Sequence, residues 1–308
     1  MSCRSAGVTC TPHYFDDAAR RDRLFPKRSN GKCVMTGYRV GVVIPSWNSA
    51  KTLRTALTSL REQDDCVTEI IVADSGSTDG TLQICESLGI RTVYVAPGNM
   101  YAAINQGVRV LDADWVAYLN SDDFVYPDGY KRLIGRGLML NADVVYGCSD
   151  YVDAQGRFLY SLVTPVPKEL PALFNAMFFG FMPHAAIFRK RVFSELGGFD
   201  ESFRHIADME FFARASVRGK HFAAVPPPAV AAFRIHAGQI SSRESAIVKE
   251  EKSKLRGRWG HGISVAGLWA ITKWKLTNLR QYLVRWARTG ALRQSQASAS
   301  FTHSEHAR

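Results

Sequence analysis

Two neighbouring carboxylates stand at the end of an apolar run in the first half of the chain. Asp122 and Asp123 close an Asn-Ser-Asp-Asp stretch that begins at Asn120. Adjacent carboxylates at the end of a strand suit a hard divalent cation that also binds phosphate oxygens. We expect Mn²⁺ or Mg²⁺, because the sequence offers neither a thiolate pair nor clustered histidines. A polar turn with two solvated acids is the alternative.

Asp74 follows another apolar run and is a second candidate for ligand binding. A carboxylate there can accept hydrogen bonds from a nucleobase N–H or a ribose hydroxyl. The structural alternative is a turn at Gly76 followed by a residue that caps the next helix. We assign that capping role to Asp79 and the ligand-binding role to Asp74.

Trp47 lies just past the first apolar run, between Pro45 and Asn48. An aromatic side chain at this place can stack on a nucleobase, whereas a lone Trp elsewhere is more often a core or rim residue. The location favours stacking, and we include Pro45 and Asn48 with Trp47 in a predicted nucleotide-sugar site.

Asp208 stands near the start of a helix predicted over 207–217. One reading makes it a first-turn acid that stabilises the helix end. The other makes it a general base that removes a proton from an acceptor hydroxyl. The residue types leave these two readings even. His184 and His236 are isolated histidines, and spacing alone selects neither.

Alternating strands and helices must position these residues. Parallel strands joined by single helices form βαβ units, and their ligands lie beyond the carboxyl ends of the strands. The rule selects the loops at 45–49, 74–80, 96–100 and 120–127. Apolar runs predict strands at 40–44, 69–73, 91–95, 115–119, 143–147 and 157–163, and helical spacing predicts helices near 53–60 and at 81–88, 101–111, 188–196 and 207–217.

Composition is that of a globular protein with a core: 308 residues, 46% hydrophobic and 22% charged. We find no apolar run of about 18 residues and no signal peptide. Six cysteines without a CxxC pair favour reduced thiols in a cytoplasmic protein.

The net charge of +11 divides into +5 for 1–39, −3 for 40–248 and +9 for 249–308. This slightly acidic core argues against nucleic-acid binding.

The basic ends of the chain have different characters. Residues 1–37 show no period and are predicted to be poorly ordered. Residues 262–288 predict one basic amphipathic helix with Trp side chains. Such a helix can lie on an anionic bilayer, which would place the protein on the inner membrane face. Packing on its own domain or on a partner subunit is the equal alternative.

Together the segments resemble the family 2 inverting glycosyltransferases with the GT-A fold. The matching stretches, in the family's order across 40–236, are VVIPSWNSAKTLRTALTSL, EIIVADSGSTDGT, MYAAINQGV, WVAYLNSDD, PHAAIFRKRVFSELGGFDESF and ADMEFFARA. The resemblance implies an α/β fold with a mostly parallel central sheet flanked by helices. The expected organisation is an N-terminal extension (1–37), a GT-A domain (38–236) and a helical C-terminal extension (237–308).

The resemblance also implies a role for each matching residue. It places the nucleobase against Trp47 and Asp74, and the rest of the nucleotide sugar against Pro45, Asn48, Asn105, Asn120 and Asp122. It makes Asp122 the leading metal ligand, with Asp123 beside it and His236 as a metal or diphosphate contact. It puts His184 on the acceptor side and makes Asp208 the catalytic base. Ala102 departs from the pattern, since many relatives have Asp there.

The function implied is transfer of a sugar from a nucleoside-diphosphate donor, UDP-type by default, to an acceptor hydroxyl with inversion. A glycan or a lipid-linked cell-envelope intermediate is the expected acceptor. A degenerate domain that binds a nucleotide sugar or a partner without turnover is the alternative. A dinucleotide-dependent dehydrogenase is disfavoured, because no GxGxxG follows the first strand.

Overall fold

The computed structural model describes residues 38–63, 66–236, 246–259 and 264–291. Its larger sheet has seven strands in the order β10-β6-β9-β4-β1-β2-β3. All neighbours are parallel except β9, which runs antiparallel to β4 and β6. The predicted mostly parallel sheet is confirmed. The strands are β1 (Val40–Ser46), β2 (Val67–Asp74), β3 (Arg91–Tyr94), β4 (Trp115–Tyr118), β6 (Val144–Tyr146), β9 (Ala186–Arg189) and β10 (Phe222–Ala224).

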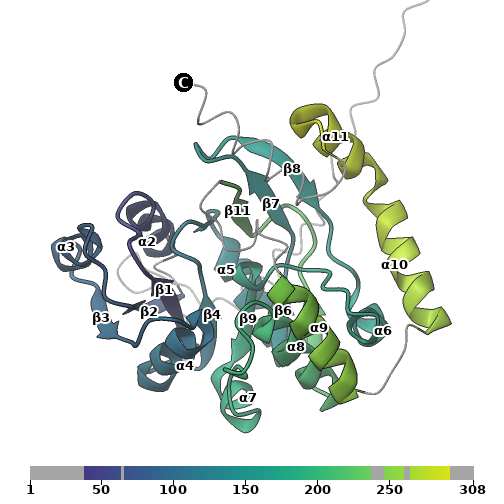
Figure 1. The fold of residues 1–308 in the computed structure, drawn as a ribbon, viewed down its shortest axis with the longest axis horizontal. Helices are drawn as coiled ribbons and strands as arrows, with labels where there is room; N and C mark the ends of the chain where they lie inside the picture. The colour runs from purple at the N-terminus through teal and green to yellow at the C-terminus, as the bar shows by residue number, and fades with distance from the viewer. Residues whose placement is uncertain (1–37, 64–65, 237–245, 260–263, 292–308) are drawn as a thin grey trace, which may run out of the picture. The chain divides into compact units, whose positions relative to one another are not determined.

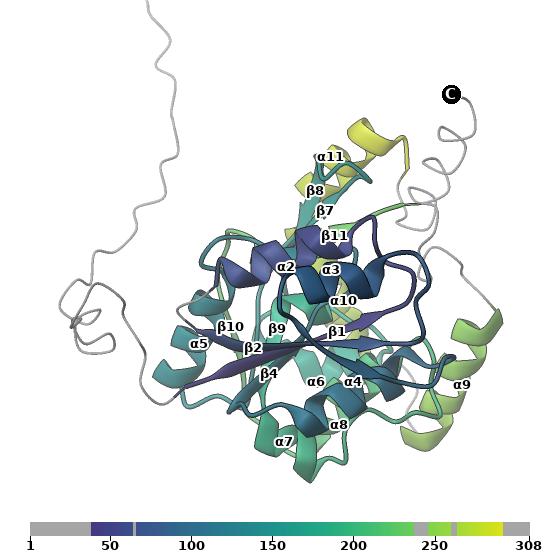
Figure 2. The same ribbon diagram turned by 90° about the vertical axis from the view of Figure 1, so that its left-hand side faces the viewer.

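Helices cover both faces of this sheet (Figure 2). On one face lie α2 (Leu53–Arg61) and α3 (Thr81–Ser87), and on the other lie α4 (Met100–Val110), α7 (Lys190–Glu195) and α8 (Ala207–Val217). Helix α4 packs closely on β1 at Gly107, which has no Cβ. A Cβ added there would stand only 2.5 Å from Val43 Cγ1. A buried cluster that includes Ile71, Phe188 and Phe211 fills the space between the sheet and this helical layer.

The predicted helix over 188–196 is wrong at its start. Phe188 belongs to β9, where it pairs with Val116 of β4 and Val144 of β6, and it is buried. Pairing on both sides keeps the chain extended through Arg189, and α7 begins only at Lys190.

A smaller sheet stands beside the ends of the larger one (Figure 1). Its strand order is β5-β11-β7-β8, with β11 antiparallel to β5 and parallel to β7. The arrangement brings residues near 232 against residues near 124, which are far apart in the chain. The strands are β5 (Phe124–Val125), β7 (Ser149–Val152), β8 (Phe158–Leu162) and β11 (Ala231–Arg234), and the helices α5 (Gly129–Met139) and α6 (Leu170–Asn175) complete this part of the chain.

The C-terminal helical extension contains α9 (Ala246–Trp259), α10 (Val265–Thr277) and α11 (Leu279–Thr289). The single helix predicted over 262–288 is wrong, since α10 and α11 meet at Asn278. Asn278 Oδ1 accepts the Val163 N–H at 2.7 Å and its Nδ2 donates to the Val163 carbonyl at 3.1 Å. This attachment to the end of β8 interrupts the helix.

Among the described residues, no helix combines the length and apolar character needed to cross a bilayer. The poorly ordered extension predicted over 1–37 lies outside the described residues, as do 262 and 263.

Candidate active site

The loops that follow β1 and β2 are tied to each other. Ser46 and Asp74 are paired neighbours at the ends of the two strands. The Asn48 N–H donates to Ser77 Oγ at 2.8 Å, and Asn48 Oδ1 accepts the Thr78 N–H at 2.9 Å. Asn48 has a φ of 49°, which turns the chain towards the second loop. Asn48 thus lies at the predicted strand ends and fixes the shape of both loops.

Asp74 is buried at the end of β2 and organises the loop after it. Its Oδ1 accepts the N–H groups of Gly76 and Ser77 at 3.0 and 2.8 Å, and its Oδ2 accepts the Ser77 hydroxyl at 2.6 Å. The cap predicted at Asp79 is wrong by one residue, since Gly80 is the N-cap of α3. Asp79 still binds the start of the helix, because its Oδ1 accepts the Thr81 N–H at 3.1 Å.

Trp47 is the exposed element of this surface, with 67% of the residue accessible to solvent. It follows directly on β1, whose Pro45 pairs with Ala73 of β2. The pairing of β1 with β4 ends earlier, at Val43, so the missing N–H of Pro45 costs no hydrogen bond on that side. An exposed indole beside the strand ends is available for stacking.

The turn after β4 presents Asp122 at the same edge of the sheet. Asp122 Oδ2 lies 2.8 Å from His236 Nε2, and both side chains are partly exposed. His236 follows β11, which Arg234 joins to the turn by donating from Nε to the Asp122 carbonyl at 2.8 Å. The turn is linked to the β1 loop by Ser49 and Ser121, whose Oγ atoms are 2.8 Å apart. The two predicted ligands Asp122 and His236 are therefore neighbours.

Asp123 points the opposite way, into the protein. Its Oδ1 accepts the Arg234 N–H at 2.9 Å and its Oδ2 accepts Asn120 Nδ2 at 2.9 Å. Burial, together with the charge of neighbouring Asp122, raises the pKa of Asp123 well above its ordinary value. Asn120 Oδ1 is buried and has no hydrogen-bond partner in the described chain.

His184 lies behind Asp123. Its Nδ1 is 3.4 Å from Asp123 Oδ2, and its ring stacks on Phe233 with 5.6 Å between ring centres. Burial lowers the pKa of His184 to about 3, so the ring is neutral. As placed, this side chain supports the β4 turn from inside; its predicted contact with an acceptor stays a prediction.

Asp208 lies in the first turn of α8, as predicted, and is bound to the end of β4. Its Oδ2 accepts the Tyr118 hydroxyl at 3.1 Å and its Oδ1 accepts the Met209 N–H at 2.7 Å. Burial raises the pKa of Asp208 to about 6, although hydrogen bonds from Met209, Tyr101 and Tyr118 act in the opposite direction. Tyr118 is the last residue of β4, so the carboxylate stands next to the strand that leads to Asn120 and Asp122.

Glu251 of α9 holds the loop that leads into α8. Its carboxylate oxygens accept the N–H groups of Arg204, His205 and Ile206. Sequence reasoning missed this residue, because an acid in a Lys- and Glu-rich helix has no signal that distinguishes it from solvated neighbours. Its buried position shows that α9 supports the segment that carries Asp208.

Asn105 is buried on α4 and binds the loop before α8. Its Nδ2 donates to the Phe199 carbonyl at 2.8 Å and to Glu201 Oε1 at 2.9 Å, and its Oδ1 accepts the Phe199 N–H at 2.9 Å. Each polar atom of the amide is thus engaged with the loop before α8.

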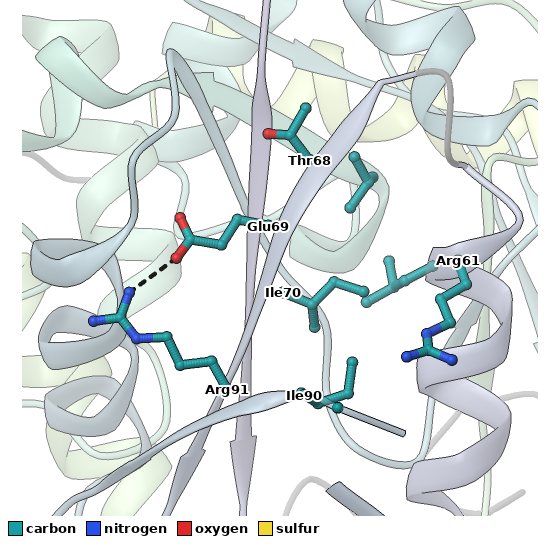
Figure 3. A pocket seen from close by; sticks show the side chains of 9 residues that line it. Arg61, Thr68, Glu69, Ile70, Ile90 and Arg91 are labelled. Atoms are coloured by element: carbon teal, nitrogen blue, oxygen red, sulfur yellow. Dashed lines mark hydrogen bonds and ion pairs between the residues drawn. The ribbon is translucent and has the colours of Figure 1, made fainter. Parts of the chain in front are cut away.

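The pocket in Figure 3 belongs to a different part of the molecule. It has a volume of about 340 Å³ and is lined by the beginning of β2 and by residues around Arg61 and Arg91. Arg91 and Glu69 form an ion pair at its side. Asp74 is at the other end of β2, so this pocket is separate from the candidate active site.

Asp122 and His236 offer one carboxylate and one imidazole to a cation. Among the described residues no group of three or more His, Cys, Asp and Glu is arranged to hold a metal. A two-residue site fits a cation whose remaining ligands come from a diphosphate and water, as is usual for Mg²⁺ beside phosphates. The donor set therefore agrees with a metal that arrives with its nucleotide.

The family model described as Glycosyl transferase family 2 matches residues 41–197, just over half of the chain. The chain belongs to this family. The match includes the ends of β1, β2 and β4, while Asp208, His236 and Glu251 lie beyond it. The family resemblance expected from the sequence is confirmed.

One relative is the succinoglycan biosynthesis protein ExoO of Rhizobium meliloti. It is 30% identical over 222 residues, which are 66% of this chain and 62% of ExoO. The match thus spans less than two thirds of the relative's length.

Two solved structures share the fold. Glucosyl-3-phosphoglycerate synthase from Mycobacterium tuberculosis, in complex with Mn²⁺, UDP and phosphoglyceric acid, has a TM-score of 0.56 at 20% identity over 76% of this chain and 85% of its own. TarS 1–349 of S. aureus in complex with UDP-GlcNAc has a TM-score of 0.53 at 15% identity over 88% and 92%. These similarities confirm the GT-A class of the fold.

Proposed function

We propose that this protein transfers a sugar from a nucleoside-diphosphate donor to an acceptor hydroxyl, with inversion at the anomeric carbon. The observation that carries the proposal is Asp208, a carboxylate whose pKa is raised to about 6 and which is hydrogen-bonded to the end of β4. A general base works best when its pKa is near the working pH. Membership of the family supports the same class of reaction.

The donor is proposed to lie across the ends of β1, β2 and β4. Trp47 stacks on the base, Asp74 accepts a hydrogen bond from it, and the Asn120 amide contacts the ribose. Pro45 and Asn48 shape the loop that carries Trp47, while Asn105 acts through the loop before α8. A uridine nucleotide is the first choice, because both structural neighbours described above were solved with one.

Mn²⁺ or Mg²⁺ is proposed to bind through Asp122 and His236. When bound, the cation supplies positive charge that stabilises the departing nucleoside diphosphate. The Mn²⁺ and UDP in glucosyl-3-phosphoglycerate synthase support this choice. Because Asp123 points away from the edge that holds Asp122 and binds Arg234 and Asn120 inside the protein, we give Asp123 and the neutral His184 the role of holding the Asp122 turn in place.

In the proposed step Asp208 takes the proton of the acceptor hydroxyl, and the oxygen of that hydroxyl attacks the anomeric carbon of the donor sugar. The C–O bond to the diphosphate breaks on the opposite side, so the configuration inverts. The acceptor is proposed to be a glycan or a lipid-linked cell-envelope intermediate. The printed role of ExoO in succinoglycan biosynthesis supports a saccharide acceptor.

Calorimetric titration of the full chain with UDP, GDP and dTDP, each with Mn²⁺ and after chelation, tests the donor site. We expect one nucleotide to bind in a metal-dependent way, and Asp122→Ala to weaken that binding at least roughly tenfold. Folded protein that binds none of the three would contradict the proposal. Metal-dependent binding without turnover of any sugar nucleotide and acceptor would instead favour a non-catalytic binding protein.

A further inference from the structure

Helices α10 and α11 have two faces of opposite character. The inward face is attached to β8 and α6: Trp274 Nε1 donates to the Val163 carbonyl at 2.8 Å, and Gln281 Oε1 accepts the Ser161 N–H at 3.4 Å. Asn278 and Arg285 are buried on the same face. Figure 1 shows α11 beside β8 and α10 extending towards α6. This attachment determines which side chains point away from the domain.

The opposite side, here called the outward face, is unusually apolar. Seven of the 18 exposed large apolar side chains of the described residues lie on it, and each of the seven is more than half exposed. Within each of the two helices their spacing is mostly three, four or seven residues, which puts them on the side away from the buried Trp274 and Arg285. They are Val265, Leu268, Trp269, Leu276, Leu279, Leu283 and Trp286. A cluster of this kind marks an interaction surface.

The charge of these helices has a single sign. Residues 264–291 contain no Asp or Glu. Lys273 pairs with Glu169 and Arg288 donates to the Phe158 carbonyl, so both are partly committed to the domain. Lys275 and Arg280 are exposed between the apolar side chains of the outward face. The face thus combines apolar and cationic groups with no acid.

We infer that the outward face binds an anionic membrane surface. Leu side chains can enter the boundary between headgroups and acyl chains, Trp side chains prefer that boundary, and Lys275 and Arg280 attract anionic lipids. A second copy of this face fits less well, because pairing two such faces would bring the basic groups of both copies together without a countercharge. The helices would lie in the plane of the membrane surface and carry the domain with them.

Co-sedimentation of the full chain with phosphatidylcholine vesicles, with and without phosphatidylglycerol, tests this inference. We expect binding to the vesicles that contain phosphatidylglycerol and little binding to pure phosphatidylcholine. The triple variant Leu276→Ser, Leu279→Ser, Leu283→Ser should lose at least roughly tenfold in vesicle affinity. The double variant Lys275→Glu, Arg280→Glu should lose affinity for the anionic vesicles to a similar extent.

A matched control carries Val110→Ser, Met139→Ser and Val217→Ser, three exposed apolar residues on other elements. It should bind vesicles as the unchanged protein does. The inference is overturned if the full chain does not bind anionic vesicles, or if the triple variant binds them with unchanged affinity. It is also overturned if sedimentation velocity shows a dimer that the triple variant dissolves while vesicle binding persists. Nucleotide titration of the same variants should be unchanged, which separates this test from that of the donor site.

Discussion

The acidic residues at the end of β4 and those at the start of α8 have different surroundings and different proposed roles. At the β4 end two adjacent carboxylates face different surroundings: Asp122 meets His236 at a partly exposed edge, and Asp123 is buried against Arg234 and Asn120. At the α8 start Asp208 accepts hydrogen bonds from the Tyr118 hydroxyl and the Met209 N–H, and burial raises its pKa to about 6. The comparison shows that surroundings, and not adjacency in the chain, decide what an acid can do.

The largest effect is expected at the α8 site. Asp208→Asn keeps the size of the side chain but removes the base, so turnover should fall by roughly 10²- to 10⁴-fold. Nucleotide binding, which depends on the other site, should stay unchanged. Steady-state kinetics with the donor identified by titration, followed by calorimetry of the variant, measures both. Nearly full turnover in Asp208→Asn would contradict its role as the base. A loss of nucleotide affinity together with turnover would contradict the separate roles of the two sites.

At the β4 site the two neighbours should respond differently. Asp122→Ala is expected to weaken metal-dependent nucleotide binding while the melting temperature stays nearly constant, because the side chain is partly exposed. Asp123→Ala leaves the buried Arg234 N–H and Asn120 Nδ2 without their acceptor, at a cost of about 1–3 kcal/mol for each buried group. Thermal unfolding should therefore detect Asp123→Ala and miss Asp122→Ala. Equal melting temperatures for the two variants would contradict the separate roles.

The sequence was sufficient to predict much of the larger sheet but little of the smaller one. Strands β1, β2 and β4 are continuous apolar runs that end in turn residues, which is the pattern of buried parallel strands. Strand β11 is only Ala231–Arg234, and its pairing with β5 joins residues more than a hundred positions apart. Local spacing contains no signal for such pairing.

The same limit applies to the site. The positions of Trp47 and Asp74 at strand ends followed from the βαβ rule, and so did the edge that holds Asp122. The burial of Asp123 depends on a backbone N–H from β11, and the support from Glu251 depends on α9 returning to the loop before α8. Both are tertiary contacts that no short pattern in the sequence reports.

A smaller effect is expected from the support of α8. Glu251→Gln keeps the shape but removes the charge that binds three backbone N–H groups, so the Asp208 carboxylate should be less well positioned. We expect turnover to fall roughly three- to tenfold, with KM nearly unchanged. Glu250→Gln, an exposed neighbour on the same helix, is the matched control. Equal kinetics for the two variants would show that α9 does not act on the α8 site.

The smallest expected effect is a shift in the pH dependence of turnover when Tyr118 is replaced by Phe. Asp208 must be deprotonated to accept a proton, so turnover should decline about tenfold for each pH unit below the pKa of about 6. The Tyr118 hydroxyl donates to the carboxylate and lowers this pKa. Tyr118→Phe should therefore raise the pKa and shift the acid limb of the turnover profile to higher pH.

The shift separates an electrostatic role of Tyr118 from packing. Tyr118→Phe keeps the buried ring, so at alkaline pH, where Asp208 is deprotonated in both proteins, turnover should be similar. Near pH 6 the variant should be slower, because more of its Asp208 is protonated. Tyr146→Phe removes another buried hydroxyl, which donates to the Pro165 carbonyl, and should leave the acid limb in place. A uniform loss at all pH values in Tyr118→Phe would mean that the hydroxyl orients the α8 site without tuning its base.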